Sequence, residues 1–71
     1  MIKTIDCSKS SHISAILYSD ETQTLRVEYS NGEAYNYFDV PAEVADEIEK
    51  AESKGRALHQ YIYSFYQFRQ L

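Results

Sequence analysis

The chain is poor in the residues on which disulfide-bonded, metal-binding and membrane proteins depend. Cys7 is its only cysteine, which excludes an internal disulfide and favours an inert thiol. His12 and His59 lack cysteine and carboxylate neighbours at metal-ligand spacing, and a zinc site needs about four ligands. No apolar run approaches the roughly 18–20 residues of a membrane span. The composition therefore predicts no metal, no cofactor and no membrane partner.

Glycine and proline are also scarce, with two glycines and one proline in the chain. Two isolated glycines cannot form the glycine-rich loop that cradles phosphate groups in many nucleotide-binding enzymes, and no nucleophile elbow is present. The residues therefore indicate that the protein is not an enzyme.

The chain also has few positively charged residues. Asp and Glu outnumber Lys and Arg by 11 to 7, which gives a net charge of −4. Proteins that grip nucleic-acid backbones usually have a basic balance or a clear basic patch. Lys54 and Arg56 nevertheless flank Gly55 before a helix, where free N–H groups could bind an anion. The alternative, which we favour, is that Gly55 is an ordinary helix cap.

A chain of 71 residues makes one small domain, and such a domain buries only about 60% of its unfolded surface. Dimerisation would enlarge the buried core, so we expect a homodimer. Met1–Asp6 lacks the apolar core of a signal peptide, which favours a cytoplasmic location. Residues 1–9 are expected to form an arm or a short edge strand, and residues 10–71 a single domain.

Three stretches have the pattern of β-strands: Ile13–Tyr18, Thr24–Tyr29 and Glu33–Phe38. In the second stretch Leu25, Val27 and Tyr29 alternate with polar residues, which is typical of a half-buried strand. The polar connections between the three stretches have the length of hairpin loops. The pattern predicts a three-stranded antiparallel meander.

The register of the second hairpin decides which way Tyr35 and Tyr37 face. A two-residue turn ending at Gly32 would place both tyrosines on the solvent side, as a platform for a flat ligand. A bulged loop with Gly32 in the left-handed conformation would pair Val27 with Tyr35, placing both tyrosines on the core face. Asn36 would then face solvent. We favour the bulge, because burying Asn36 without partners costs about 1–3 kcal/mol.

Two helices are predicted after the strands, over Ala42–Ser53 and Arg56–Phe68, and the fold class is therefore α+β with both helices packed on one face of the sheet. Gly55 is well placed to end the first helix in the left-handed conformation. The first helix carries five acidic residues: Glu43, Asp46, Glu47, Glu49 and Glu52. We interpret them as a solvated face, and the alternative is an acidic binding surface.

The second predicted helix has two aromatic stripes. Its buried stripe consists of Leu58, Tyr61, Ile62, Phe65 and Phe68. His59, Tyr63 and Tyr66 fall on a different side, at a spacing of one turn. We therefore predict that Tyr63 is largely exposed and that Tyr63 and Tyr66 belong to an interface or ligand surface. The alternative is a surplus of aromatic residues that a small core cannot hold.

The order and spacing of residues along the chain match a known pattern. The matching residues are Ser10, Ser11, Ile13, Tyr18, Leu25, Val27, Tyr29, Gly32, Tyr35, Asn36, Tyr37, Val40, Pro41, Ala51, Ser53, Gly55, Leu58, Ile62 and Tyr66. In this order they resemble the KTSC domain, a family named after the C-terminal domain of some lysyl-tRNA synthetases that also occurs as free-standing small proteins. The resemblance covers about residues 10–68. It implies RNA binding, which is suggested for the family by association with the synthetase.

The chain departs from the family pattern in its last helix. Tyr63 and Phe65 stand where the family tends to have basic residues, and Ala57 stands where an aromatic residue is usual. The lost positive charges would weaken the affinity for a polyanion. The resemblance therefore implies a weaker RNA contact here than in other members.

Two functions stay open at the level of sequence. The first is a non-enzymatic module that binds RNA or a small nucleotide through aromatic, Lys and Arg contacts. Its candidate residues are Tyr35, Tyr37, Lys54, Arg56 and His59. The second is a protein-interaction module, an inhibitor or adaptor, that uses the Tyr63 and Tyr66 strip and the acidic helix. The acidic charge favours a small or structured ligand over long RNA.

Overall fold

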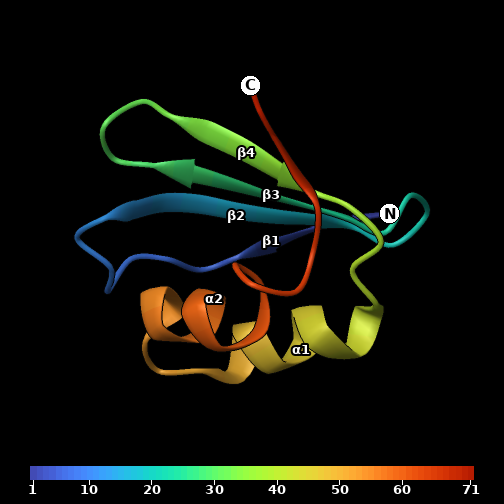
Figure 1. Cartoon of the computed structure of the whole chain (residues 1–71). Helices are drawn as coiled ribbons and strands as arrows, with labels where there is room; N and C mark the ends of the chain where they lie inside the picture. Colours follow the sequence, from blue (N-terminus) through green and yellow to red (C-terminus); the bar gives the residue numbers. More distant parts are fainter.

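The computed structural model describes all 71 residues and shows one sheet with two helices on one of its faces (Figure 1). The elements in chain order are β1 (Ile2–Ile5), β2 (Ile13–Ser19), β3 (Thr24–Tyr29), β4 (Ala34–Tyr37), α1 (Ala42–Lys50), α2 (Lys54–Tyr61) and β5 (Phe68–Gln70). The strands lie in the order β1-β2-β3-β4-β5, and every neighbouring pair is antiparallel. The predicted α+β class and the meander at its centre are confirmed.

The sheet has five strands rather than the three predicted for the meander, and β5 was not anticipated at all. For residues 1–9 the sequence allowed either an arm or a short edge strand. The structure has an edge strand there, β1, which pairs Ile5 with Ile16 of β2. Its side chains alternate only weakly, because Ile5 is its one buried residue. Backbone hydrogen bonds to β2 hold β1 in the sheet, and the pattern of its side chains does not reveal this pairing.

The second helix ends at Tyr61 rather than continuing to Phe68. The chain then turns back, and β5 pairs with β4, so that Phe68 lies opposite Tyr37. The backbone N–H of Phe38 donates to the carbonyl of Gln67 at 3.0 Å, which extends this pairing. The free edge of β4 offers backbone partners that the local helical pattern cannot reveal, and this tertiary pairing overrides the helix propensity of the segment.

The second hairpin has the bulged register favoured from the sequence. Val27 pairs with Tyr35 and Leu25 with Tyr37. Gly32 has a φ of 95°, a conformation that a residue without Cβ adopts readily. The tyrosines consequently lie on the helix-facing side of the sheet, with Tyr37 buried and Tyr35 half-buried.

The connection between the helices differs from the prediction. α1 stops at Lys50, and Ala51 is already extended. Gly55 lies inside the first turn of α2, and its φ is not positive, so it does not end α1. Ser53 caps α2 instead, because its hydroxyl accepts the backbone N–H of Arg56 at 3.3 Å.

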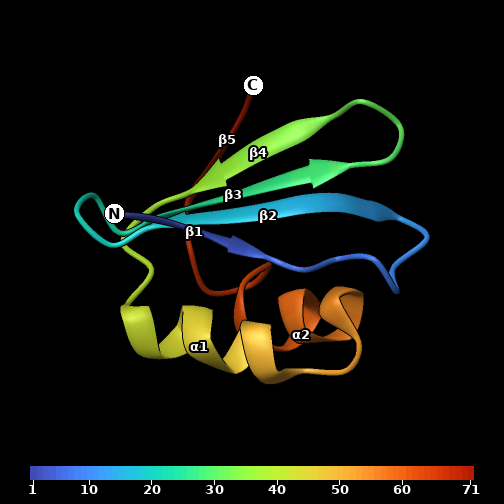
Figure 2. The ribbon, with the colours of Figure 1, turned by 180° about the vertical axis from the view of Figure 1, so that it is seen from behind.

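The core lies between the sheet and the helices, as the reverse view shows (Figure 2). Its largest fully buried side chains are Ile5, Ile16, Leu25, Val27, Val40, Ile48, Leu58 and Ile62. No polar or charged residue is buried with them. Tyr18 closes the core where β4 leads into α1, since its hydroxyl donates to the carbonyl of Val40 at 2.6 Å. Neither helix has the length and apolar character needed to cross a membrane.

Candidate functional site

A polar cleft of about 540 Å³ lies between the β1–β2 loop and the connection from α1 to α2. Figure 1 shows this loop beside the start of α2. The loop contributes Asp6, Ser8, Lys9, Ser10, Ser11 and His12, and the helix connection contributes Glu49, Lys50, Ala51, Glu52, Ser53, Lys54 and Gly55. Only one of these thirteen lining residues is hydrophobic. A ligand of this cleft would therefore be recognised by charge and hydrogen bonds.

The two basic residues predicted to flank an anion site are not brought together. Lys54 donates from its ammonium group to the carbonyls of Glu49 at 2.7 Å and Ala51 at 2.6 Å. These contacts hold its charge at the C-terminal end of α1, where a cation stabilises the helix dipole. Arg56 does not line the cleft and instead borders a separate hollow with Gln60. Lys54 is thus largely a structural residue.

The cleft has two other lysines, which sequence reasoning missed. Lys9 and Lys50 are exposed, and neither forms an ion pair. Two of the three lining carboxylates do have partners. Asp6 accepts the backbone N–H of Ser8 at 2.9 Å, which lowers the pKa of its carboxyl group, and Glu49 pairs with Lys3 at 2.6 Å. The available positive charge of the cleft is therefore that of Lys9 and Lys50.

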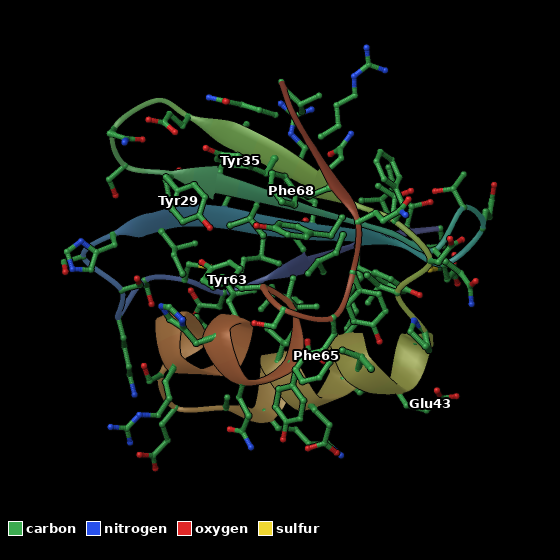
Figure 3. All side chains as sticks on the ribbon, viewed as in Figure 1. Tyr29, Tyr35, Glu43, Tyr63, Phe65 and Phe68 are labelled. Atoms are coloured by element: carbon green, nitrogen blue, oxygen red, sulfur yellow. The ribbon has the colours of Figure 1, made fainter.

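A second feature, the aromatic hollow, lies beside the turn of the β3–β4 hairpin and holds about 430 Å³. Its lining residues are Tyr29, Asn31, Glu33, Tyr35, Tyr37, Tyr63 and Phe68. Figure 3 shows Tyr29, Tyr35 and Phe68 close together beside the C-terminal strand, with Tyr63 between them and α2. The predicted ligand residues Tyr35 and Tyr37 therefore line this hollow, which shares no lining residue with the polar cleft.

Tyr63 is half-buried, and the prediction that it is largely exposed was wrong. Its hydroxyl lies 2.6 Å from that of Tyr29, and its ring centre is 6.1 Å from that of Tyr37. His59, which is exposed, packs edge-on against Tyr63 with 4.7 Å between ring centres. The prediction failed because it assumed helical phase beyond Tyr61, where the chain has already left the helix.

The predicted strip of exposed tyrosines is consequently not formed. Tyr66 is also half-buried and packs against the core. The exposed aromatic residues of this segment are Phe65 and Phe68, at 67% and 57%, both of which the sequence placed in the core. The acidic face of α1 is also partly neutralised, because Lys3 pairs with Asp46 at 2.9 Å as well as with Glu49.

Two tyrosines of the aromatic hollow, Tyr29 and Tyr37, have raised pKa values. Burial is the main cause that raises the pKa of Tyr29 above that of a free tyrosine, and the hydrogen bond to Tyr63 raises it further. Burial also raises the pKa of Tyr37. The charge of the hollow is therefore carried by Glu33. No group of three or more His, Cys, Asp or Glu side chains lies close enough to hold a metal ion.

Comparison with known proteins identifies the fold and the family. The sequence model of the KTSC domain matches residues 9–66. The chain belongs to the KTSC domain family. A KTSC domain protein from Yersinia pestis has the same fold in its crystal structure, with a TM-score of 0.86 and 26% identity over 100% of this chain and 99% of that one. The resemblance found in the sequence is confirmed.

Relatives of this KTSC domain occur in long and short proteins. The chain is 41% identical over 61 residues to a lysine–tRNA ligase from Nostoc sp., covering 86% of the chain and 11% of the ligase. It is 40% identical over 52 residues to an uncharacterized protein from Stutzerimonas stutzeri, covering 73% of each. The chain thus spans about a tenth of the length of the ligases it matches, and most of the length of the short relative.

The two halves of the KTSC pattern meet in the polar cleft. Ser10 and Ser11 lie in its loop, and Ala51, Ser53 and Gly55 in its helix connection. These motifs are far apart in sequence, and their serines shape the backbone. The hydroxyl of Ser10 accepts the N–H of Ile13 at 3.1 Å, and Ser53 caps α2. The KTSC pattern itself was the signal that could have located this cleft.

Proposed function

We propose that this KTSC domain is a non-enzymatic module that binds RNA or a nucleotide through phosphate groups held in the polar cleft. The observation that carries the proposal is the convergence of the two KTSC motifs around Lys9 and Lys50, neither of which forms an ion pair, although the charge of Lys9 attracts the nearby carboxylate of Asp6. A relative of the chain is named as a lysine–tRNA ligase, a protein that acts on RNA. Ammonium groups form charge-assisted hydrogen bonds to phosphate oxygens.

The charge of the chain limits how many phosphates it can hold. The protein has a net charge of −4, and Glu52 adds a carboxylate to the rim of the cleft. Two free lysines would neutralise about two phosphates, which predicts a shallow salt dependence compared with strongly basic RNA-binding proteins. The proposed ligand is therefore a short or structured stretch of RNA, or a single nucleotide.

Replacing Lys50 with alanine is expected to weaken binding of a transfer RNA or a short single strand about tenfold at low salt, because one charge-assisted contact is lost. The slope of log affinity against log salt concentration should fall in magnitude by about 1. Lys9→Ala should behave alike. Titrations at two salt concentrations, run in parallel with mononucleotides, measure both quantities and distinguish RNA from a free nucleotide.

Arg69→Ala is the matched control, since it removes the same charge from an exposed residue on β5, away from the cleft. It should leave the affinity almost unchanged. Equal losses for Lys50→Ala and Arg69→Ala would show that only the overall field of the protein acts on the ligand. The absence of saturable binding to RNA and to nucleotides would refute the proposed function.

A protein-interaction module is the second candidate, and the exposure of Phe65 favours it. Phe65, Phe68 and Leu71 expose apolar surface on the C-terminal segment, at 67%, 57% and 56%. Exposed aromatic side chains of this kind can anchor an interface. A homodimer is the simplest case, and light scattering should then give twice the chain mass of 8.3 kDa. Phe65→Ser should return the mass to that of one chain, whereas a monomeric mass at all concentrations rules the dimer out.

A further inference from the structure

The rings of the aromatic hollow form walls in different planes. The rings of Tyr29 and Tyr35 are 5.7 Å apart and inclined at 84°, and those of Tyr35 and Phe68 are 5.8 Å apart and inclined at 62°. Tyr37 and Phe68 add a third close pair at 5.6 Å and 41°. Figure 3 shows Tyr29, Tyr35 and Phe68 grouped at one place beside the C-terminal strand. A flat nucleobase stacks on one ring face at a time, whereas a rounded group can contact several inclined rings at once.

The charge of the hollow is negative. Glu33 is its one charged lining residue, and no Lys, Arg or His is among the residues that line it. His59 packs against the ring of Tyr63. The carboxylate is held in place at the rim, because it accepts the hydroxyl of Tyr35 at 2.9 Å and the side-chain amide of Asn31 at 3.2 Å. The faces of aromatic rings also attract positive charge. The hollow therefore favours a cation and disfavours a phosphate group.

The hydrogen-bonding state of the hollow selects the kind of cation. The hydroxyls of Tyr29 and Tyr63 bond to each other at 2.6 Å, and that of Tyr35 is engaged with Glu33. The acceptors near an ammonium or guanidinium group would be mainly oxygens that already take part in these hydrogen bonds, so its N–H groups gain little by leaving water. A quaternary ammonium has no N–H groups to satisfy. We infer that the aromatic hollow binds a quaternary ammonium group, with Glu33 facing its charge.

Choline, its neutral isostere 3,3-dimethylbutan-1-ol and the primary amine ethanolamine test the inference on the intact chain. In a titration followed by amide chemical shifts, choline should bind at least about fivefold more tightly than either of the other two compounds. The shifted amides should be those of the β3–β4 hairpin, Tyr63 and Phe68. If the neutral isostere binds as tightly as choline, the hollow recognises apolar groups without regard to charge, and the inference fails. Tighter binding of ethanolamine would overturn the assignment of the ligand.

Two variants with matched controls locate the site. Phe68→Leu keeps an apolar side chain but removes a ring face, and Glu33→Gln removes the charge, and each should weaken choline binding about three- to tenfold. Phe65→Leu and Glu43→Gln change the same residue types at exposed positions that do not line the hollow, and they should leave the affinity unchanged (Figure 3).

Loss of choline binding can be distinguished from loss of folding and from loss of RNA binding. Glu33 is exposed, so Glu33→Gln should keep the wild-type melt even if Phe68→Leu loosens β5. Equal losses in a variant and its control, or the absence of saturable choline binding, would refute the inference. Loss of RNA binding in Lys50→Ala with choline binding intact would show that the two sites act independently.

Discussion

Replacing Tyr63 with alanine is expected to lower the free energy of unfolding by about 2–3 kcal/mol, because the residue is half-buried and well contacted. The variant loses a ring that packs near Tyr37 and leaves the hydroxyl of Tyr29 without its partner at 2.6 Å. An unpartnered, partly buried hydroxyl adds to the cost of the lost packing. In a domain of this size, each kcal/mol lowers the melting temperature by roughly 4–8 °C, so a calorimetric melt should shift by about 8–24 °C.

Phe65→Ala is the matched control two residues along the chain. Phe65 is 67% exposed, and its replacement should change stability by no more than about 0.5 kcal/mol. The sequence pattern predicts the opposite for this pair, with Phe65 in the core and Tyr63 in solvent. A much lower melting temperature for Phe65→Ala, together with a wild-type melting temperature for Tyr63→Ala, would therefore contradict the fold beyond Tyr61.

The contrast between Tyr63 and Phe65 shows where local pattern stops being informative. The alternation of Leu25, Val27 and Tyr29 and the left-handed preference of Gly32 are local properties, and they predicted the central meander and its register. Nothing between Tyr61 and Phe68 breaks a helix, since the segment contains neither glycine nor proline. The helix ends there because the distant β4 edge offers a pairing partner, which no local window contains.

The residues of the candidate sites also differ in whether local sequence pattern or only the tertiary fold reveals them. Tyr35 and Tyr37 were identified as neighbours because they lie in one strand. Lys9 and Lys50 were missed, because the fold alone brings a loop after β1 next to the end of α1. Lys54 was recognised as a basic residue beside a helix, but its ammonium group is engaged by two backbone carbonyls. Residue type is readable from sequence, whereas the availability of a charge depends on tertiary contacts.

The two proposed sites fit the acidic character of the chain in different ways. The polar cleft concentrates its unpaired positive charge on two lysines, so it can hold a small anion despite the net charge of −4. The aromatic hollow combines ring faces with Glu33 and suits a cation. A single ligand that bridges both would carry separated charges, and the paired titrations with RNA and choline reveal whether the sites are coupled.

Alkaline pH is expected to unfold the domain steeply, because burial raises the pKa of Tyr18, Tyr29 and Tyr37 above their value in the unfolded chain. Below a pH of about 10 these tyrosines are neutral in both states, and their contribution to stability is complete. Above it, the unfolded chain releases protons that the folded protein retains, so rising pH lowers the free energy of the unfolded state relative to the folded state. Each tyrosine then removes about 1.4 kcal/mol of stability per pH unit until its folded pKa is reached.

Each such group lowers the free energy of unfolding by at most about 1.4 kcal/mol per pH unit, and a typical small domain has only about 5–15 kcal/mol in total. Circular dichroism and tyrosinate absorbance, followed together against pH, should therefore change in one cooperative step above pH 10. Tyr29→Phe removes one of the three groups and should make the loss of stability shallower by about 1.4 kcal/mol per pH unit. Added salt screens general repulsion between surface charges and should leave that difference in place. Gradual ionisation of all the tyrosines near pH 10 with the fold intact would contradict the burial of this cluster.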